Sequence, residues 1–497
     1  MKTSQATLDP ADWQAFRLQG HRMLDDIFDH LQHLRDTPVW HPAPDVARTA
    51  FQHALPHGES DLSLAHDIFM REVLPYAAGN SHPGFMGWVH GGGTPVGMLA
   101  EMLAAGLNAN LGGRNQMPVE VERQMVAWVR ELFGFPETAS GLLVTGTSMA
   151  NFMGLLVARF AALGESSRPE GLTDGHRLTA YTSAGAHLSI AQALDMAGLG
   201  TAALRKIAVD EQHRMDVAAL ERAIAADRAA GLMPFFIAAT AGTVDVGAID
   251  PLEAIADLAQ REQIWFHVDG AYAALGKMAP DIAPLLLGME RADSIAFDFH
   301  KWGQVPYDAG FLLVRDGELH RRTFSSPAAY LHRETRGLAG GSPWPCDFGP
   351  DLSRSFRALK TWFTLQVYGA DKLGQVISHT CELARYLRGR IADTARLELL
   401  APVALNIVCF RYLGADASGR ALDDFSSDRL NAEILIAVQE SGIAAPSGTH
   451  VKGRFAIRAA IVNHRTVAAD IDALVDAVLA TGAALEQGIH SKAEHGN

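Results

Sequence analysis

The amino-acid sequence predicts an α/β protein built on a mostly parallel sheet. From about residue 142 onward, short runs of branched apolar residues alternate with longer amphipathic segments, which is typical of β-α units. A carboxylate and a lysine each follow one of these runs, as expected where parallel strands end at one sheet edge. The 497 residues are 48% hydrophobic and 20% charged, so the chain can bury a large core.

Seven segments are predicted strands because they are short and rich in branched residues. They are residues 141–145, 178–182, 203–209, 234–240, 264–268, 294–298 and 310–314. The segments between them carry apolar residues three and four apart and are predicted helices; they are residues 149–163, 188–197, 217–231 and 251–263. A short connection precedes the last strand, which is therefore expected to run antiparallel to its neighbour.

The two ends of the chain differ from this central pattern. Residues 11–34 are a predicted amphipathic helix before a proline-rich stretch, which indicates an arm. After about residue 374, mixed helix and strand patterns predict a smaller α+β unit. We therefore expect an arm at residues 1–90, a large domain at residues 91–375 and a small C-terminal domain at residues 376–497. Residues 325–350 are long and poorly patterned, which favours a mobile active-site loop.

Composition excludes several classes of function. The 42 basic and 56 acidic residues give a net charge of −14, so nucleic acid is not an expected partner. The cysteines Cys346, Cys381 and Cys409 lack metal-type spacing, and no H-E-x-x-H pattern occurs, so we expect neither disulfides nor a metal site. Without a signal peptide or an 18-residue apolar run, a cytoplasmic protein with no membrane partner is expected.

A lysine, Lys301, comes just after the predicted strand 294–298 and directly follows His300. Burial at a strand end would favour the neutral amine, which can form a Schiff base with a carbonyl compound. The alternative is a lysine that extends from the strand end to solvent. The residues around Lys301 do not by themselves separate the two interpretations.

Asp269 follows a second predicted strand, and one helix and one strand fit between it and Lys301. Both side chains are therefore expected at the same carboxyl edge of the sheet. A carboxylate and a Schiff-base lysine suit pyridoxal phosphate, because the acid keeps the ring nitrogen protonated and the ring then accepts electrons. The alternative role of Asp269 is a helix cap or an ordinary ion pair.

Two further motifs fit a phosphorylated ring. Gly146, Thr147 and Ser148 form a tight turn between a predicted strand and a helix, where free N–H groups bind anions. The alternative is an ordinary helix cap. His187 begins the helix after the strand 178–182, and its imidazole could stack on a cofactor ring or serve as a half-buried cap.

Together these residues resemble the group II pyridoxal-phosphate-dependent amino-acid decarboxylases, which include the aromatic-L-amino-acid, histidine, glutamate and diaminobutyrate decarboxylases. The similarity covers about residues 11–485, and seven motifs match in order. They are residues 80–85 (NSHPGF), 146–151 (GTSMAN), 186–189 (AHLS), 239–243 (ATAGT), 267–272 (HVDGAY), 300–302 (HKW) and 356–360 (FRALK).

The resemblance implies an aspartate-aminotransferase-like fold (fold type I) with a seven-stranded, mostly parallel sheet and a small C-terminal α+β domain. It also implies a homodimer in which the arm packs on the partner. The implied cofactor is pyridoxal phosphate, with Lys301 as the Schiff-base lysine, Asp269 on the ring nitrogen and His187 on the ring face. Further implied cofactor contacts are Thr147, Ser148, Met149, Thr243, Ala271, Asp298 and His300, and the implied substrate pocket contains Trp88 and His82.

The implied reaction is decarboxylation of an L-amino acid to the amine, with the aromatic class slightly favoured by Trp88. An oxygen-dependent conversion to an aldehyde on the same scaffold is the alternative. It is associated with relatives that lose a loop tyrosine, and counting back from Phe356 places Trp344 and Pro345 at that position. More distant alternatives are a carbon–carbon lyase for phosphorylated sphingoid bases, disfavoured without an anchor, and a non-catalytic scaffold, disfavoured by the retained site residues.

Overall fold

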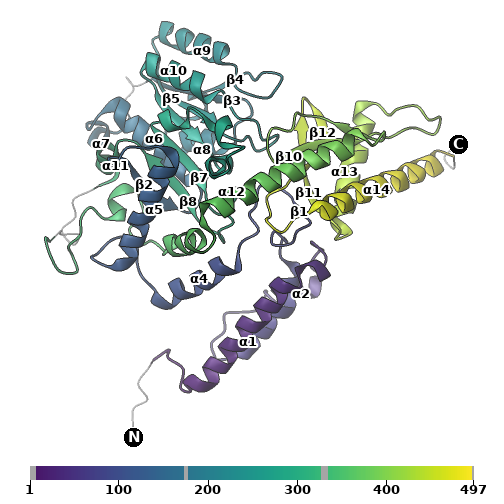
Figure 1. Cartoon of the computed structure of the whole chain (residues 1–497), viewed down its shortest axis with the longest axis horizontal. Helices are drawn as coiled ribbons and strands as arrows, with labels where there is room; N and C mark the ends of the chain where they lie inside the picture. Colours follow the sequence, from purple (N-terminus) through teal and green to yellow (C-terminus); the bar gives the residue numbers. More distant parts are fainter. Residues whose placement is uncertain (1–6, 173–176, 326–333, 495–497) are drawn as a thin grey trace.

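A seven-stranded sheet forms the centre of the large domain (Figure 1). The computed structural model describes residues 7–172, 177–325 and 334–494. The strand order is β2-β8-β7-β6-β5-β3-β4, and β8 alone runs antiparallel to its neighbours β7 and β2. The predicted sheet and its antiparallel last strand are thus confirmed. The bounds are β2 (Ser140–Val144), β3 (Leu178–Ser183), β4 (Leu204–Ile207), β5 (Met233–Thr240), β6 (Trp265–Asp269), β7 (Ser294–Asp298) and β8 (Gly310–Val314).

Helices cover both faces of this sheet, so its strands are buried on both sides. Along β5, Phe236 and Ala238 pack under α6 and α8, whereas Ile237 and Ala239 pack toward α5, α9 and α10. The helices of this domain are α4 (Pro95–Leu107), α5 (Met117–Phe133), α6 (Thr147–Leu163), α7 (Ser167–Glu170), α8 (Ser189–Met196), α9 (Val217–Ala229), α10 (Leu252–Glu262) and α11 (Gly317–Phe324).

A second sheet, of five strands in the order β1-β11-β12-β10-β9, forms the small domain. Its strands are β1 (Phe85–Met86), β9 (Leu397–Leu399), β10 (Ile407–Tyr412), β11 (Ala445–Val451) and β12 (Arg454–Ala460). Helices α13 (Asp424–Glu440) and α14 (Ala468–Glu494) pack beside it, and the long α12 (Arg357–Ala392) joins the two domains.

Strand β1 ties the N-terminal segment to the small domain. It pairs in parallel with β11, with Phe85 opposite Ala445. The sequence analysis did not anticipate β1 or β9, because strands of two or three residues are too short to show a periodic pattern. It also missed β11, whose sequence contains Pro446 and Gly448.

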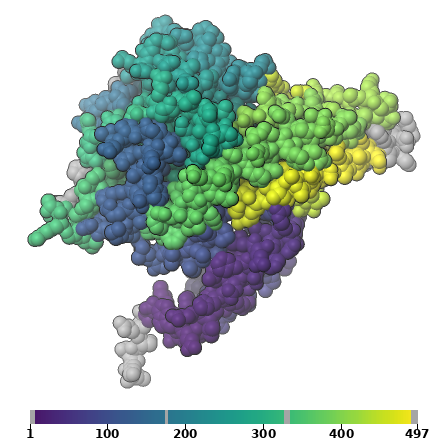
Figure 2. Space-filling view, viewed as in Figure 1, coloured from purple at the N-terminus to yellow at the C-terminus, as the bar shows by residue number. Residues whose placement is uncertain are grey.

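The N-terminal helix α1 (Trp13–Gln32) lies away from both sheets, as the outlying purple helix in Figures 1 and 2 shows. It has no buried residue, and its apolar side chains Trp13, Phe16 and Leu18 are exposed. The short helices α2 (Asp45–Thr49) and α3 (Leu62–Ile68) follow it. The predicted amphipathic helix is therefore present, with ends two residues inside the predicted ones.

Short helical turns complete the described chain. They are η1 (Leu34–Asp36), the π-helical η2 (Phe69–Val73), η3 (Leu74–Tyr76), η4 (Thr201–Ala203), η5 (Ala273–Met278), η6 (Ala283–Leu286), η7 (Met289–Arg291) and η9 (Pro345–Phe348). Within the described residues, none of the helices combines the length and the apolar character needed to cross a membrane.

Candidate active site

A cavity of about 460 Å³ opens at the carboxyl edge of the parallel strands. The ends of β2, β5, β6 and β7 and the loop after β1 contribute to its wall. This is the place where open α/β sheets bind ligands. The predicted site residues that line it are Trp88, Thr147, Ser148, Met149, His187, Asp269, Ala271, Asp298, His300 and Lys301.

The turn from β2 into α6 forms one end of the cavity. Gly310, at the start of β8, packs directly against the backbone of this turn: a Cβ on Gly310 would come within 2.4 Å of Gly146 Cα. Helix α6 begins at Thr147, whose Oγ1 is buried without a hydrogen-bond partner among the described residues. A helix N-terminus with a free buried hydroxyl is a suitable place for a phosphate group.

Lys301 enters the cavity from the turn after β7. Its Nζ lies 2.8 Å from Oδ2 of Asp298, and that carboxylate also accepts the Thr147 N–H at 2.8 Å. His300 Nε2 lies 3.6 Å from the same carboxylate, and its Nδ1 accepts the Ala309 N–H. Burial lowers the pKa of His300, and the charge of Asp298 opposes that effect.

Asp269, at the end of β6, is buried at the floor of the cavity. Its Oδ1 accepts the Ala271 N–H at 3.1 Å, and its Oδ2 accepts an N–H of Asn151 at 2.9 Å. Burial raises the pKa of Asp269, while the hydrogen bond from Asn151 and the charge of Lys301 oppose this. The carboxylate is thus suited to holding a cationic group or a proton.

His187 is half-buried in the wall of the cavity, just before α8. Its Nδ1 accepts the Ser189 N–H at 3.2 Å and lies 2.9 Å from Ser189 Oγ. These contacts fix the plane of the imidazole ring. A fixed flat ring beside Asp269 and Lys301 can cover one face of a planar ligand.

Two predicted residues do not line this cavity. His82 is buried, and its Nδ1 accepts the N–H of Gly84, two residues later in the chain. This bond stabilises the local turn. Thr243 is buried as well, and its hydroxyl accepts the Ala248 N–H in the turn after β5. Local hydrogen bonds of this kind compete with ligand contacts, and a sequence motif does not reveal them.

The described part of the predicted mobile loop packs on the protein. Trp344 is buried against Gly113, and its indole N–H donates to the Gly340 carbonyl at 2.8 Å. Trp344 therefore has a packing role away from the cavity. Residues 326–333 of the predicted loop lie outside the described residues.

Three aromatic residues of the cavity, His90, Tyr272 and Tyr307, were not among the predicted site residues. The His90 ring stacks on Trp88 with centroids 5.8 Å apart, and Tyr307 meets the His90 ring edge-on at 5.8 Å. Burial and the charge of Lys301 lower the pKa of His90, which favours the neutral form of the ring. His90 could have been proposed from its position two residues after Trp88. Tyr307 lies in a turn whose sequence has no periodic pattern that would identify it.

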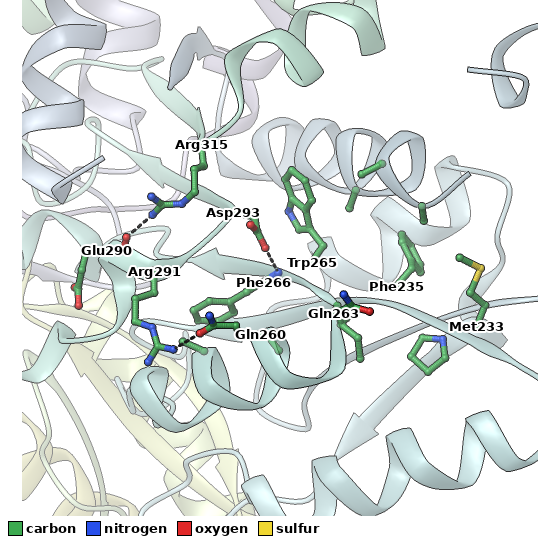
Figure 3. A pocket seen from close by; sticks show the side chains of 17 residues that line it. Met233, Phe235, Gln260, Gln263, Trp265, Phe266, Glu290, Arg291, Asp293 and Arg315 are labelled. Atoms are coloured by element: carbon green, nitrogen blue, oxygen red, sulfur yellow. Dashed lines mark hydrogen bonds between the residues drawn. The ribbon is translucent and has the colours of Figure 1, made fainter. Parts of the chain in front are cut away.

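A larger cavity, of about 640 Å³, lies at the other end of β5 and β6 (Figure 3). Its charged groups are already paired: Arg315 donates to the Ala292 carbonyl, Asp293 accepts the Phe266 N–H, and Arg291 pairs with Asp257. We therefore place the functional site at the carboxyl edge. No group of three or more potential metal ligands is found in the part of the chain that the structure describes.

The carboxyl-edge cavity fits pyridoxal phosphate. The α6 N-terminus and the unpartnered Thr147 hydroxyl suit its phosphate, Asp269 suits its ring nitrogen, and Lys301 suits its aldehyde. The hydroxyl of Thr240, which also lines the cavity, is another buried group without a partner among the described residues.

Comparisons with known proteins agree with this fit. The family model described as the pyridoxal-dependent decarboxylase conserved domain matches residues 44–413. Aromatic-L-amino-acid decarboxylase of Bacillus atrophaeus is 32% identical, over 91% of this chain and 92% of that protein. Phenylacetaldehyde synthase of Arabidopsis thaliana is 28% identical, over 92% of this chain and 94% of that protein. The crystal structure of Oryza sativa TDC with PLP and tryptamine superposes with a TM-score of 0.87 at 25% identity, covering 97% of this chain and 100% of that one.

Proposed function

The chain belongs to the pyridoxal-dependent decarboxylase family and is an amino-acid decarboxylase that uses pyridoxal phosphate, and we propose that its substrates are aromatic L-amino acids. The observation that carries the substrate class is the stacked pair Trp88 and His90, which faces the cavity of Lys301. Flat aromatic walls favour flat aromatic side chains through offset stacking and burial. The similarity to an aromatic-L-amino-acid decarboxylase supports the same class.

The overall reaction removes the α-carboxyl group of the substrate and replaces it with a proton. The bond between the α-carbon and the carboxyl carbon breaks, its electron pair stays on the α-carbon, and carbon dioxide leaves. One proton from the enzyme or solvent then forms the new carbon–hydrogen bond, and the primary amine is the product. When bound, pyridoxal phosphate supplies an aldehyde that condenses with amines and a pyridinium ring that accepts the electron pair.

We assign each side chain a task from its position. Lys301 Nζ is the amine that holds the cofactor covalently, with Asp298 at 2.8 Å as its counter-ion. Asp269 holds a proton on the ring nitrogen, which keeps the ring a strong electron acceptor. His187 would cover one ring face, and its bonds to Ser189 fix the orientation of the imidazole.

The phosphate site is assigned to the α6 N-terminus, with Thr147, Ser148 and Met149. His300 lines the same part of the cavity. Asp298 takes part through its bond to the Thr147 N–H, because a carboxylate would repel a phosphate in direct contact. Ala271 lines the cavity beside Asp269, where it leaves room for the ring.

We also propose that the enzyme is a homodimer. Helix α1 has no buried residue and exposes Trp13, Phe16 and Leu18, so it needs a surface to cover these side chains. Helix α4 likewise exposes Met102, Leu103 and Leu107. A cytoplasmic location is proposed from the buried free thiols Cys381 and Cys409, which suit a reducing compartment.

A panel of L-amino acids, with carbon dioxide and oxygen followed in parallel, tests this function. We expect tryptophan, tyrosine, phenylalanine or a hydroxylated relative to give amine and carbon dioxide in equal amounts, without oxygen uptake. Aldehyde, ammonia and peroxide with oxygen uptake would support the alternative instead. Turnover confined to acidic or aliphatic amino acids would contradict the aromatic class.

A further inference from the structure

A buried asparagine, Asn151, lies one turn into α6, behind the floor of the active-site cavity. Its side chain is fully buried, and every polar atom of its amide has a partner. Nδ2 donates to Oδ2 of Asp269 at 2.9 Å and to Oγ of Ser189 at 3.1 Å. Oδ1 lies 2.8 Å from Nε2 of His267. A buried amide with this many partners has one orientation, because turning it over would place its oxygen against a carboxylate.

That orientation determines the direction of the neighbouring hydrogen bonds. Since Oδ1 of Asn151 can only accept, His267 carries its proton on Nε2 and accepts at Nδ1 from the Ser294 hydroxyl at 2.8 Å. Ser294 in turn accepts the indole N–H of Trp265 at 2.8 Å. Burial lowers the pKa of His267 to about 3, so the ring stays neutral in this role.

The bonds therefore form one directed chain that follows β6 from its first residue to its last. It runs from Trp265, in the wall of the cavity of Figure 3, through Ser294, His267 and Asn151, and ends on Asp269. Each group donates toward the carboxylate, and aligned hydrogen bonds in a buried environment reinforce one another. The chain stabilises a charge on Asp269 that burial alone disfavours.

A branch of the same network reaches the other ring contact. The second N–H of Asn151 goes to Ser189 Oγ, and the Ser189 hydroxyl is then free to donate to Nδ1 of His187 at 2.9 Å. The Asn151 amide thus bonds Asp269, which is assigned to the ring nitrogen. Through the Ser189 hydroxyl it also reaches His187, which is assigned to the ring face. Asp269 ends β6 and His187 comes just before α8, and Asn151 and Ser189 together connect the two side chains.

We propose that Asn151 is a positioning residue that sets the Asp269 carboxylate and the His187 imidazole relative to each other and to the bound ring. The proposal rests on the roles given to Asp269 and His187 in the proposed function. It assigns Asn151 no contact with the substrate. Its effect is on how tightly the cofactor is held and on how firmly the ring nitrogen keeps its proton.

The variant Asn151→Asp tests this with little change in shape. It keeps an acceptor for His267 but replaces both donated bonds with a carboxylate oxygen facing Asp269. We expect the dissociation constant of pyridoxal phosphate for the full-length protein to rise by about tenfold or more. We also expect the pH midpoint of the visible band of the loaded protein to move by about half a unit or more, since the charge beside the ring has changed.

Two further variants separate the branches. Ser189→Ala removes the hydroxyl that joins Asn151 to His187 and leaves the bond between Asn151 and Asp269 in place, so we expect weaker cofactor binding, by about threefold, with the pH midpoint unchanged. Ser140→Ala is the matched control, because Ser140 Oγ bonds Nδ1 of the buried His320 at 2.7 Å far from the cavity. Ser140→Ala should change neither the cofactor dissociation constant nor the pH midpoint of the visible band. If Asn151→Asp does not fold, Ser189→Ala decides the proposal through its cofactor affinity.

The proposal is overturned if folded Asn151→Asp binds pyridoxal phosphate with the affinity and pH midpoint of the unchanged protein. It is also overturned if the variant loses only thermal stability while both cofactor readings stay the same. Failure of the proposed function looks different, because the unchanged protein would then release no carbon dioxide from any L-amino acid. The two cofactor readings do not depend on turnover.

Discussion

Nζ of Lys301 lies 2.8 Å from Oδ2 of Asp298, three residues earlier in the chain. The carboxylate is almost fully buried, and its other oxygen accepts the Thr147 N–H. The lysine proposed to bind the cofactor and the turn proposed to bind its phosphate therefore share one acidic group. This geometry holds the amine at the edge of the cavity and provides an acceptor for the proton it must lose before it attacks a carbonyl.

Replacing Lys301 with alanine should abolish the visible absorption of the loaded protein and reduce turnover by about a thousandfold or more. The reason is that no other lysine lines the cavity among the described residues. Absorption spectra recorded before and after borohydride reduction test whether the cofactor is still bound to a lysine. Lys277→Ala, which alters a lysine paired with Glu290, is the control. A Lys301→Ala protein that stays yellow through a reducible bond would show that the lysine is misassigned.

The same substitution should also destabilise the cofactor-free protein at neutral pH, because it leaves the Asp298 carboxylate buried without its cation. Breaking such a pair costs about 1–3 kcal/mol where one partner is partly exposed. Adding Asp298→Asn should restore much of the loss, since the amide oxygen still accepts the Thr147 N–H. Urea unfolding of the single and double variants makes the comparison. Equal stability of Lys301→Ala and the double variant would contradict the pairing.

Asp269→Asn should fold and still contain cofactor, yet lose most of its activity. The amide keeps the size of the side chain but cannot hold the ring nitrogen protonated, so the ring accepts electrons poorly. The fall should be in kcat, by about a hundredfold or more, with less change in KM. Steady-state kinetics and near-ultraviolet circular dichroism make the measurement. Near-normal kcat in a folded variant would remove Asp269 from the mechanism.

Acid should destabilise the fold through His320. Burial lowers the pKa of this histidine to about 3, whereas the unfolded chain titrates near 6.5. Between these values the unfolded state binds the extra proton, so the free energy of unfolding falls as pH drops below 6.5, by up to about 1.4 kcal/mol per pH unit. Urea unfolding at pH 7.5 and 5.0 should show this fall.

His320→Phe should make that fall smaller, because the ring packs among Phe324 and Phe348 and no longer titrates. The control is Ser140→Ala, which loses the hydrogen bond to His320 but keeps the titrating ring. Its pH dependence should match that of the unchanged protein. An unaltered pH dependence in His320→Phe would show that other groups cause the acid sensitivity.

The product of the reaction should depend on Tyr330. Counting back from Phe356 led to Trp344, but that indole is buried against Gly113. Tyr330 carries a hydroxyl in the predicted loop, and it lies outside the described residues. If it supplies the proton to the α-carbon, Tyr330→Phe should shift the product from amine toward aldehyde with oxygen uptake. Tyr386→Phe, whose hydroxyl bonds Asp472, is the control. An unchanged amine yield in Tyr330→Phe would exclude this role.

The sequence alone determined the central sheet and the core of the site. Strands β6 and β7 are short apolar runs, and Asp269 and Lys301 come at or just after their ends, so the rule for parallel sheets was enough to bring them together. The turn at Gly146 and Thr147 was also predictable, because a strand end, a glycine and a helix start are all local features of the sequence.

Only the tertiary structure decided how these groups are held. Asn151 and Asp269 are 118 residues apart and bond each other, and Arg458 of β12 donates to the Trp88 carbonyl across 370 residues. The same holds for His82 and Thr243, whose motifs matched although Nδ1 of His82 and the hydroxyl of Thr243 bond within their own turns. A local pattern fixes which residues end a strand, whereas hydrogen-bond partners depend on which segments burial brings into contact.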